Sequence, residues 1–124
     1  MNIVDSSGWL EYFVDGPKAG LFSGPIQDRE SLVVSPVSIF EVFRVVSRER
    51  NESAAFRAVA AMRGVRTIDV DSALAVAAAL LAALHGLPMA DSLILATARA
   101  AEAVLWTLDA HFEGLPGVKF FTKQ

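Results

Sequence analysis

Four acidic residues lie at separate places in the sequence where a short apolar run gives way to a polar turn or a helix. They are Asp5, Glu41, Asp91 and Asp109. Carboxylate oxygens are the ligands that hard divalent cations prefer, and Mg²⁺ binds a few of them while keeping several waters. Such a cation makes water more acidic and stabilises charge that develops on a phosphoryl oxygen. If the four side chains converge, they are suited to hydrolysing a phosphodiester.

The elements that must position these acids alternate between strands and helices. Short apolar runs predict strands at Asn2–Val4, Leu32–Ser35, Arg66–Ile68, Ala103–Leu108 and Val118–Phe121. Helical periodicity predicts helices at Gly8–Val14, Ile39–Val46, Ser53–Arg63, Ser72–Leu84 and Met89–Glu102. The glycines and proline of Gly16–Gly24 predict a loop or short turn. Strands that alternate with helices are typical of an α/β domain with a parallel sheet, which we expect over residues 1–124.

A parallel sheet would bring the four acids to one edge, because strand carboxyl ends and helix N-termini lie there together and bind ligands. Asp5 directly follows the first strand, and Asp109 follows the fourth. Glu41 lies one turn into the helix after the second strand, and Asp91 lies in the first turn of the helix opened by Pro88. No lysine or arginine stands at these junctions. Because clustered carboxylates repel one another, this pattern favours a divalent cation between them.

Each acid also has a purely structural interpretation. Ser38 and Glu41 have the S-x-x-E spacing of a capping box at a helix N-terminus. Asp5 can cap the helix that follows it, and Asp109 can begin a turn. Asp91, in a first helical turn, interacts favourably with the helix dipole. For each acid taken alone the structural role is favoured, whereas for all four together the metal site and the structural roles both remain open.

Other kinds of chemistry have less support. The chain has no cysteine, which excludes disulfides, zinc fingers and thiol catalysis. It contains no G-x-x-x-x-G-K-[ST], no G-x-G-x-x-G and no G-x-S-x-G motif. Asp71 is expected to cap the helix that starts at Ser72. His85 precedes a glycine at a helix end, and His111 lies two residues beyond Asp109, where a single histidine is usually incidental.

Composition agrees with one folded domain. The 124 residues are 53% hydrophobic and 20% charged, which excludes intrinsic disorder, and the net charge of -3 comes with no basic run. The N-terminus lacks the charged region of a signal peptide. Residues 72–90 carry no charged side chain but are interrupted by Gly86 and Pro88, so we expect a buried helix and a connection, not a membrane span. A soluble, cytoplasmic protein is expected.

Four blocks of sequence together resemble the PIN-domain family, and most closely the VapC-type toxins of bacterial toxin–antitoxin pairs. The blocks are DSSGWLEYF, VSPVSIFEVFRVV, GLPMADSLILATA and LWTLDAHF, each of which holds one of the four acids. The resemblance runs from the first residues to the last strand with matching order and spacing. The P-x-A-D-S-x-I-x-A-x-A and T-x-D-x-x-F patterns are its most specific parts.

The resemblance implies a three-layer α/β/α sandwich with a central, mainly parallel sheet. It also implies an endoribonuclease that depends on Mg²⁺ or Mn²⁺, in which water activated by the metal attacks an RNA phosphodiester in line. Asp5, Glu41, Asp91 and Asp109 stand at the positions of the family's metal-binding acids. Ser6 and Thr107 stand where the family keeps a small hydroxyl beside them, and Glu113 either adds an acid or faces solvent.

The expected partners are an RNA substrate, a cognate antitoxin whose peptide arm lies in a groove near the acids, and a second copy of the chain in a homodimer. Arg44, Arg48 and Arg99 are candidate RNA-binding residues, although a solvated helix face explains most such arginines. The alternative is a non-catalytic α/β protein-interaction module whose acids only cap helices and bind no divalent cation. An aspartyl-phosphate protein is disfavoured, because no second acid follows Asp5 two residues on.

Overall fold

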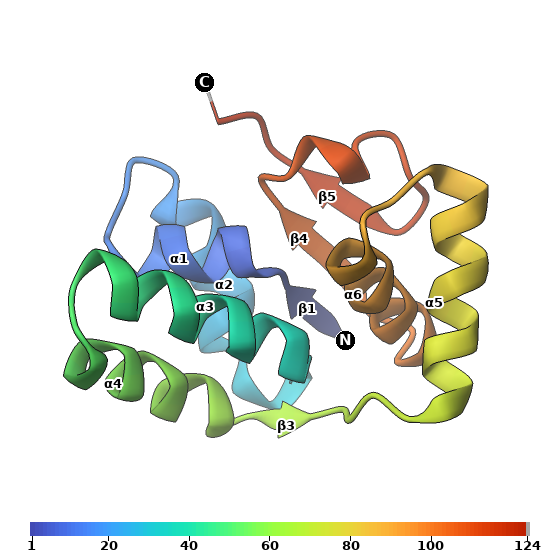
Figure 1. The fold of residues 1–124 in the computed structure, drawn as a ribbon. Helices are drawn as coiled ribbons and strands as arrows, with labels where there is room; N and C mark the ends of the chain where they lie inside the picture. The colour runs from blue at the N-terminus through green and yellow to red at the C-terminus, as the bar shows by residue number, and fades with distance from the viewer. Residues whose placement is uncertain (124) are drawn as a thin grey trace.

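A parallel sheet of five strands forms the centre of the computed structural model, which describes residues 1–123 (Figure 1). The strands are β1 (Asn2–Val4), β2 (Leu32–Val34), β3 (Arg66–Thr67), β4 (Val104–Thr107) and β5 (Val118–Phe120). Their order is β3-β2-β1-β4-β5, and each neighbouring pair is parallel. Central β1 pairs Asn2 with Leu32 on one side and with Val104 on the other. The predicted α/β domain with a parallel sheet is confirmed.

Helices cover both faces of this sheet (Figure 1). One face carries α1 (Ser6–Phe13), α2 (Ala19–Gln27), α3 (Pro36–Glu49) and α4 (Glu52–Arg63), and the other carries α5 (Ser72–His85) and α6 (Met89–Ala100). Successive strand residues point to opposite faces, so Val4 and Val34 join the core beneath α1–α4, whereas Ile3, Val33 and Leu105 pack on the side of α6. The expected three-layer α/β/α sandwich is therefore confirmed.

The prediction of a loop at Gly16–Gly24 is wrong for its second half, because α2 begins at Ala19 and continues to Gln27. Two glycines and Pro25 lower the local helix propensity, which is why the sequence alone indicates a loop. Burial overrides that propensity: Phe22 and Ile26 lie on one face of α2 and pack into the core beneath α1–α4. Tertiary packing supplies most of the stability of such a helix.

The capping box predicted from Ser38 and Glu41 is also wrong. Helix α3 starts earlier, with Ser35 as its N-cap and Pro36 at its first position, and the Ser35 hydroxyl accepts a hydrogen bond from Val37 N at 3.1 Å. Proline fits the first helical turn because it has no N–H to leave unpaired. Ser38 therefore lies inside the helix, and Glu41 in the second turn does not cap it. By contrast, Asp71 caps α5 as expected, accepting from Leu74 N at 2.8 Å.

The uncharged segment of residues 72–90 forms α5 and the start of α6, with a break at Gly86, whose φ of 67° lies in the left-handed region that favours glycine. Among residues 1–123, no single helix has both the length and the hydrophobicity needed to cross a membrane. Helices α5 and α6 meet these criteria only as a pair, and that pair is bent by 115° at the break.

Gly8 is needed where α1 packs closely on β1 and α2. A Cβ atom at this position would lie 2.5 Å from Val4 Cγ1 and 2.7 Å from the Phe22 ring. We expect Gly8→Ala to lower the free energy of unfolding by about 1–3 kcal/mol through overpacking, measured by urea denaturation. Gly20→Ala in α2 is the matched control, since its Cβ would meet nothing within 4 Å and alanine favours helix. Equal stability of both variants would contradict the packing argument.

Candidate metal centre

Three of the predicted acids meet at the carboxyl edge of the sheet. Asp5 directly follows β1, Asp109 lies two residues after the end of neighbouring β4, and Asp91 lies in the first turn of α6. The chain turns from β1 to β2 on one side and returns to β4 on the other, so these residues lie at the topological switch point, where ligands bind in open α/β sheets. Thr107 Oγ1 is hydrogen-bonded to both Asp5 Oδ2 and Asp109 N, and Asp91 and Asp109 both contact His111, so the three aspartates are neighbours.

The Asp5 carboxylate is buried and held by three hydrogen bonds. Its Oδ1 accepts from Ser7 Oγ at 2.6 Å and from Gly8 N at 3.3 Å, and its Oδ2 accepts from Thr107 Oγ1 at 2.9 Å. Asp5 is also the N-cap of α1, so its structural role holds as well. An ionised carboxylate has about four acceptor sites, so three hydrogen bonds leave capacity for a cation.

Two hydroxyl groups fix the ends of β1 and β4 relative to each other. Thr107 Oγ1, besides donating to Asp5, accepts from Asp109 N at 2.8 Å. Ser7 Oγ accepts from Leu108 N at 3.0 Å while donating to Asp5. Ser7 is not among the site residues predicted from the sequence. The sequence feature that indicates a role for Ser7 is its position two residues after Asp5, because a serine at the start of a helix can donate a hydrogen bond to a carboxylate just before it.

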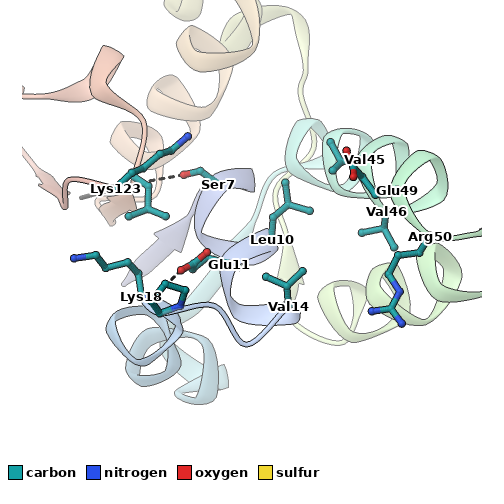
Figure 2. Close-up of a pocket in the computed structure, with 12 residues that line it drawn as sticks. Ser7, Leu10, Glu11, Val14, Lys18, Val45, Val46, Glu49, Arg50 and Lys123 are labelled. Atoms are coloured by element: carbon teal, nitrogen blue, oxygen red, sulfur yellow. Dashed lines mark hydrogen bonds between the residues drawn. The ribbon is translucent and has the colours of Figure 1, made fainter.

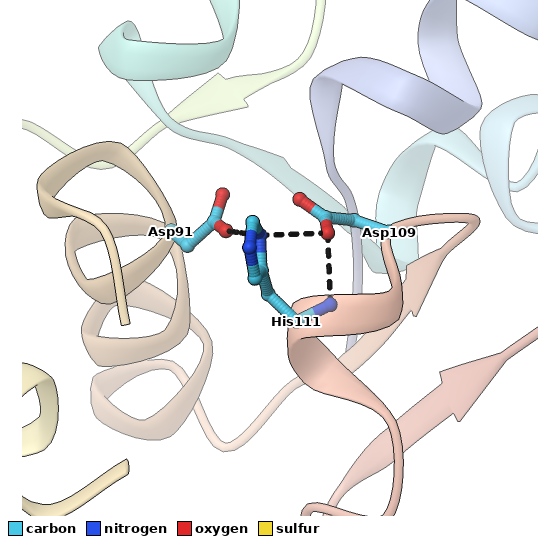
Figure 3. A group of neighbouring side chains, drawn as sticks. All are labelled: Asp91, Asp109 and His111. Carbon is cyan, nitrogen blue, oxygen red and sulfur yellow. Dashed lines mark hydrogen bonds and ion pairs between the residues drawn. The ribbon is translucent and has the colours of Figure 1, made fainter. Parts of the chain in front are cut away.

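Asp91 and Asp109 lie on either side of the His111 imidazole (Figure 3). His111 Nδ1 is 2.9 Å from Asp91 Oδ2 and 3.0 Å from Asp109 Oδ1. The interpretation of His111 as incidental is therefore wrong. The position of His111 is determined by the short 3-10 turn Ala110–Phe112. Asp109 caps this turn by accepting a hydrogen bond from His111 N at 2.9 Å. That turn directs the histidine back over the acid two residues before it.

Burial and mutual repulsion raise the pKa values of two of these acids. Removal from water is the largest cause for Asp5, whose pKa rises to about 6 although the Ser7 and Thr107 hydroxyls oppose the shift. The pKa of Asp91 rises to about 7, first through burial and then through the charge of Asp109, with His111 opposing. Among residues 1–123, no lysine or arginine forms an ion pair with these three aspartates.

These raised pKa values predict how the metal-free protein responds to pH. A carboxyl group whose pKa is higher in the folded than in the unfolded chain stabilises the fold while it is protonated. That stability is complete below about pH 4 and is lost as the pH rises through 6 to 7. For buried Asp5 the change from 3.8 to about 6 corresponds to about 3 kcal/mol.

We therefore expect the free energy of unfolding in EDTA to fall between about pH 5 and pH 8, measured by urea denaturation. The Asp91→Asn variant lacks one of the two carboxyl groups whose pKa is raised, so it should lose less stability over this range. A wild-type stability that stays flat or rises over this range would contradict the picture of three mutually repelling carboxylates.

Glu41 is connected to this group through Ser6. Ser6 Oγ donates to Glu41 Oε1 at 2.7 Å, and Ser6 immediately follows Asp5 in the chain. Glu41 is partly buried, in the second turn of α3. Each of the two predicted hydroxyl groups therefore donates a hydrogen bond to a predicted acid, Ser6 to Glu41 and Thr107 to Asp5. Direct participation of Glu41 in metal binding stays a prediction.

The three candidate RNA-binding arginines lie outside the aspartate cluster. Arg99 is in the last turn of α6, at the far end from Asp91, and its Nη2 donates to Pro116 O at 3.1 Å. Arg48 pairs with Glu49 at 3.4 Å on an exposed part of α3, and Arg44 is exposed on the same helix. Contacts between these arginines and RNA therefore stay a prediction. Glu113 is also exposed.

A largely apolar groove begins beside the site. It has a volume of about 540 Å³, and Ser7 lies at its edge (Figure 2). Leu10 of α1 and Val14, which directly follows that helix, line one side, and Val45 and Val46 of α3 line the other. Charged side chains of both signs surround it: Glu11, Lys18, Glu49, Arg50 and Lys123. Because Ser7 also contacts Asp5, a ligand in this groove would end next to the carboxylates.

The donor set fits a divalent cation. One carboxylate oxygen from each of Asp91 and Asp109 lies, together with a nitrogen of His111, within 4.8 Å of the others, and buried Asp5 adds a third carboxylate near them. A double positive charge would offset both the burial and the mutual repulsion that raise the aspartate pKa values, whereas hydrogen bonds from neutral hydroxyls oppose them only in part. The site can therefore bind a cation and present it to an anionic oxygen such as that of a phosphodiester.

Comparison with known proteins finds chains of similar fold. Among solved structures, the chain is similar to one in a toxin–antitoxin complex from Klebsiella pneumoniae, with 24% identity, a TM-score of 0.77 and 96% of each chain covered. It is also similar to Mycobacterium tuberculosis VapC20, described as a sarcin-ricin loop cleaving toxin, with 20% identity and a TM-score of 0.79 over 94% of this chain and 95% of that one. A third is DNA-bound VapBC from Salmonella typhimurium, with 14% identity and a TM-score of 0.74 over 98% of both chains.

At these identities the structural likeness shows a shared fold. No curated protein sequence matches the chain closely. The sequence model of the PIN domain matches residues 3–118, which run from β1 to the first residue of β5 and include the three converging aspartates. The chain therefore belongs to the PIN domain family.

Proposed function

We propose that the protein is an endoribonuclease dependent on Mg²⁺ or Mn²⁺, acting as the toxin of a toxin–antitoxin pair in the cytoplasm. The observation that carries this proposal is the convergence of Asp5, Asp91 and Asp109 at the switch point of the sheet, where no lysine or arginine in the described part of the chain forms an ion pair with them. Membership of the PIN domain family and the similarity to VapC and VapBC structures support it.

In the proposed mechanism, Asp5, Asp91 and Asp109 hold the divalent cation, with Glu41 as a further acid at the edge of the site. The bound cation would neutralise phosphate charge and make water more acidic. The three hydrogen bonds to Asp5 keep its carboxylate in one orientation, so the binding geometry exists before RNA arrives. Ser6 does the same for Glu41. Water adds to phosphorus, and the bond to the leaving ribose oxygen breaks.

The cognate antitoxin is proposed to place a peptide arm in the groove between α1 and α3. Its apolar lining suits aliphatic side chains, and its end at Ser7 brings the arm next to Asp5 (Figure 2). An arginine on that arm would suit the aspartates, because a guanidinium forms charge-assisted hydrogen bonds with carboxylates. An arm held this way would inhibit cleavage by occupying the cation site.

The homodimer also stays a prediction, and α5 offers a surface for it. Val76, Leu80 and Leu84 are spaced four residues apart on one face of α5 and are 63%, 68% and 74% exposed. Contiguous exposed apolar side chains commonly mark interfaces. We expect Leu84→Glu to shift the mass measured by light scattering from a dimer toward a monomer. A wild-type monomer, or a variant as dimeric as the wild type, would contradict this prediction.

Cleavage of a labelled single-stranded RNA in the presence of Mn²⁺ or Mg²⁺ tests the proposed function. The wild-type protein should cut the RNA with either ion and stop when EDTA is added. Asp109→Asn should be inactive, although asparagine can still accept from His111 N. Asp71→Asn is the matched control, since it removes the same charge from an exposed cap that asparagine fills equally well.

The rival proposal, a non-catalytic interaction module, makes the opposite prediction. If the aspartates only cap α1 and the turn after β4, then neither Mn²⁺ nor Mg²⁺ binds, and all variants behave alike. Cleavage that persists in EDTA, or equally in Asp109→Asn and the wild type, would overturn the metal-dependent mechanism.

A further inference from the structure

His111 lies where one more ligand of the proposed cation would be. Its Nδ1 atom faces both Asp91 Oδ2 and Asp109 Oδ1, at 2.9 and 3.0 Å (Figure 3). The metal-binding residues predicted from the sequence are acids alone, so this nitrogen is an addition to that set. The proximity of an imidazole nitrogen to two of those acids raises the question of what it does when the cation is bound.

The two distances match the spacing of neighbouring ligands around one ion. Mg²⁺ and Mn²⁺ are surrounded octahedrally, and with metal–ligand distances of about 2.1 Å the adjacent ligand atoms lie about 3 Å apart. The contacts from Nδ1 to the two carboxylate oxygens both have this length. All three ligand atoms lie within 4.8 Å of one another, which is close enough for them to share one ion.

The ring is held in this position by the backbone. His111 N donates to Asp109 Oδ1 at 2.9 Å, and Phe112 N donates to Asp109 O at 3.1 Å, which closes the short turn. The next side chain, Phe112, is fully buried and anchors the turn in the core beneath α6. The histidine side chain itself remains 58% exposed, so solvent can reach the ring. A ligand positioned before the metal arrives loses little conformational entropy on binding.

We propose that His111 Nδ1 is a nitrogen ligand of the cation held by Asp91 and Asp109, and that it makes the site prefer Mn²⁺ over Mg²⁺. This inference rests on the proposed metal-dependent function. Mg²⁺ strongly favours oxygen ligands, whereas imidazole nitrogen binds first-row transition metals well. Imidazole binds a metal through an unprotonated nitrogen, so the bound ion would take the place of any proton on Nδ1.

A different role for His111 would have the opposite effect. As a built-in counter-charge, the imidazole would occupy the gap between the two carboxylates and would have to move away before a cation entered. Removing it would then strengthen the binding of every divalent cation. A ligand and a competitor therefore change the Mn²⁺ affinity in opposite directions.

Calorimetric titration of Mn²⁺ and of Mg²⁺ into three proteins separates these roles. They are the wild type, His111→Ala and His85→Ala, the last of which removes the other histidine of the chain. We expect His111→Ala to weaken Mn²⁺ binding about 10-fold or more and Mg²⁺ binding much less, so that the preference for Mn²⁺ falls. His85→Ala should bind both ions as the wild type does.

Pulsed electron paramagnetic resonance of the Mn²⁺-loaded proteins gives a second measurement that does not depend on activity. His85→Ala, whose one remaining histidine is His111, should show a nitrogen hyperfine coupling to Mn²⁺, and His111→Ala should lose it. Unchanged or tighter Mn²⁺ binding by His111→Ala, or no nitrogen coupling in His85→Ala, would overturn this inference alone. Failure of the wild type to bind either ion would overturn the proposed function as well.

Discussion

The Asp91→Asn variant is expected to lose RNA cleavage by about 100-fold or more while folding normally. Asparagine keeps the size of the side chain but loses the charge that attracts a divalent cation. Asp91 is 8% exposed and faces His111 and Asp109, so the substitution acts directly at the cluster. Initial rates of cleavage in saturating Mn²⁺, with Asp71→Asn as the control of equal charge change, measure the effect.

The same variant should be more stable than the wild type when metal is absent. Asp91 has a pKa raised to about 7 by burial and by Asp109, so ionisation of Asp91 destabilises the fold at pH 8. Asparagine removes that repulsion, and the thermal midpoint in EDTA should rise. A variant that is less active but more stable is typical of a residue kept for function at the expense of stability. Retained activity, or a variant that unfolds more easily at pH 8, would contradict this account.

The Thr107→Val variant should reduce cleavage by about 10- to 100-fold, because Thr107 positions two of the acids. Its fully buried hydroxyl donates to Asp5 Oδ2 and accepts from Asp109 N. Valine has the same shape but leaves both partners without this hydrogen bond. Each unpaired buried group costs about 1–3 kcal/mol, so the free energy of unfolding should fall as well.

Thr107→Ser is the control for that experiment, since serine keeps the hydroxyl and loses only a methyl group. It should retain most of the activity and bind Mn²⁺ as tightly as the wild type. The Mn²⁺ affinity of Thr107→Val, measured by calorimetry, should fall together with its cleavage rate. If valine lowers stability but leaves metal affinity and cleavage unchanged, then Thr107 only supports the fold.

The sequence predicts those parts of the fold that depend on strongly apolar, periodic segments. Each expected strand differs from the observed one by no more than one residue at either end. For the central strands β1, β2 and β4 the reason is that a buried parallel strand is a short, continuous apolar run. Helix α2 was not predicted, because Gly20, Gly24 and Pro25 indicate a loop while the burial of Phe22 and Ile26 depends on the assembled sheet. The start of α3 was misplaced because Ser35 and Ser38 are both plausible N-caps.

The convergence of three aspartates could be predicted because topology alone determines it. Residues that follow neighbouring parallel strands must lie at the same edge, so Asp5 and Asp109 meet whatever the loops do. The contacts of His111 could not be predicted in this way. They depend on two hydrogen bonds that shape the turn after β4, which Asp109 N donates to Thr107 Oγ1 and His111 N donates to Asp109 Oδ1, and no periodicity in the sequence encodes them.

Anomalous X-ray scattering from a crystal of the protein grown with Mn²⁺ tests the central claim most directly, since it locates the ion itself. We expect a peak between Asp5, Asp91 and Asp109 at the carboxyl edge of β1 and β4, which disappears in Asp91→Asn. A wild-type crystal with no peak there, at an Mn²⁺ concentration that supports cleavage in solution, would contradict the claim that these carboxylates are gathered to hold a divalent cation.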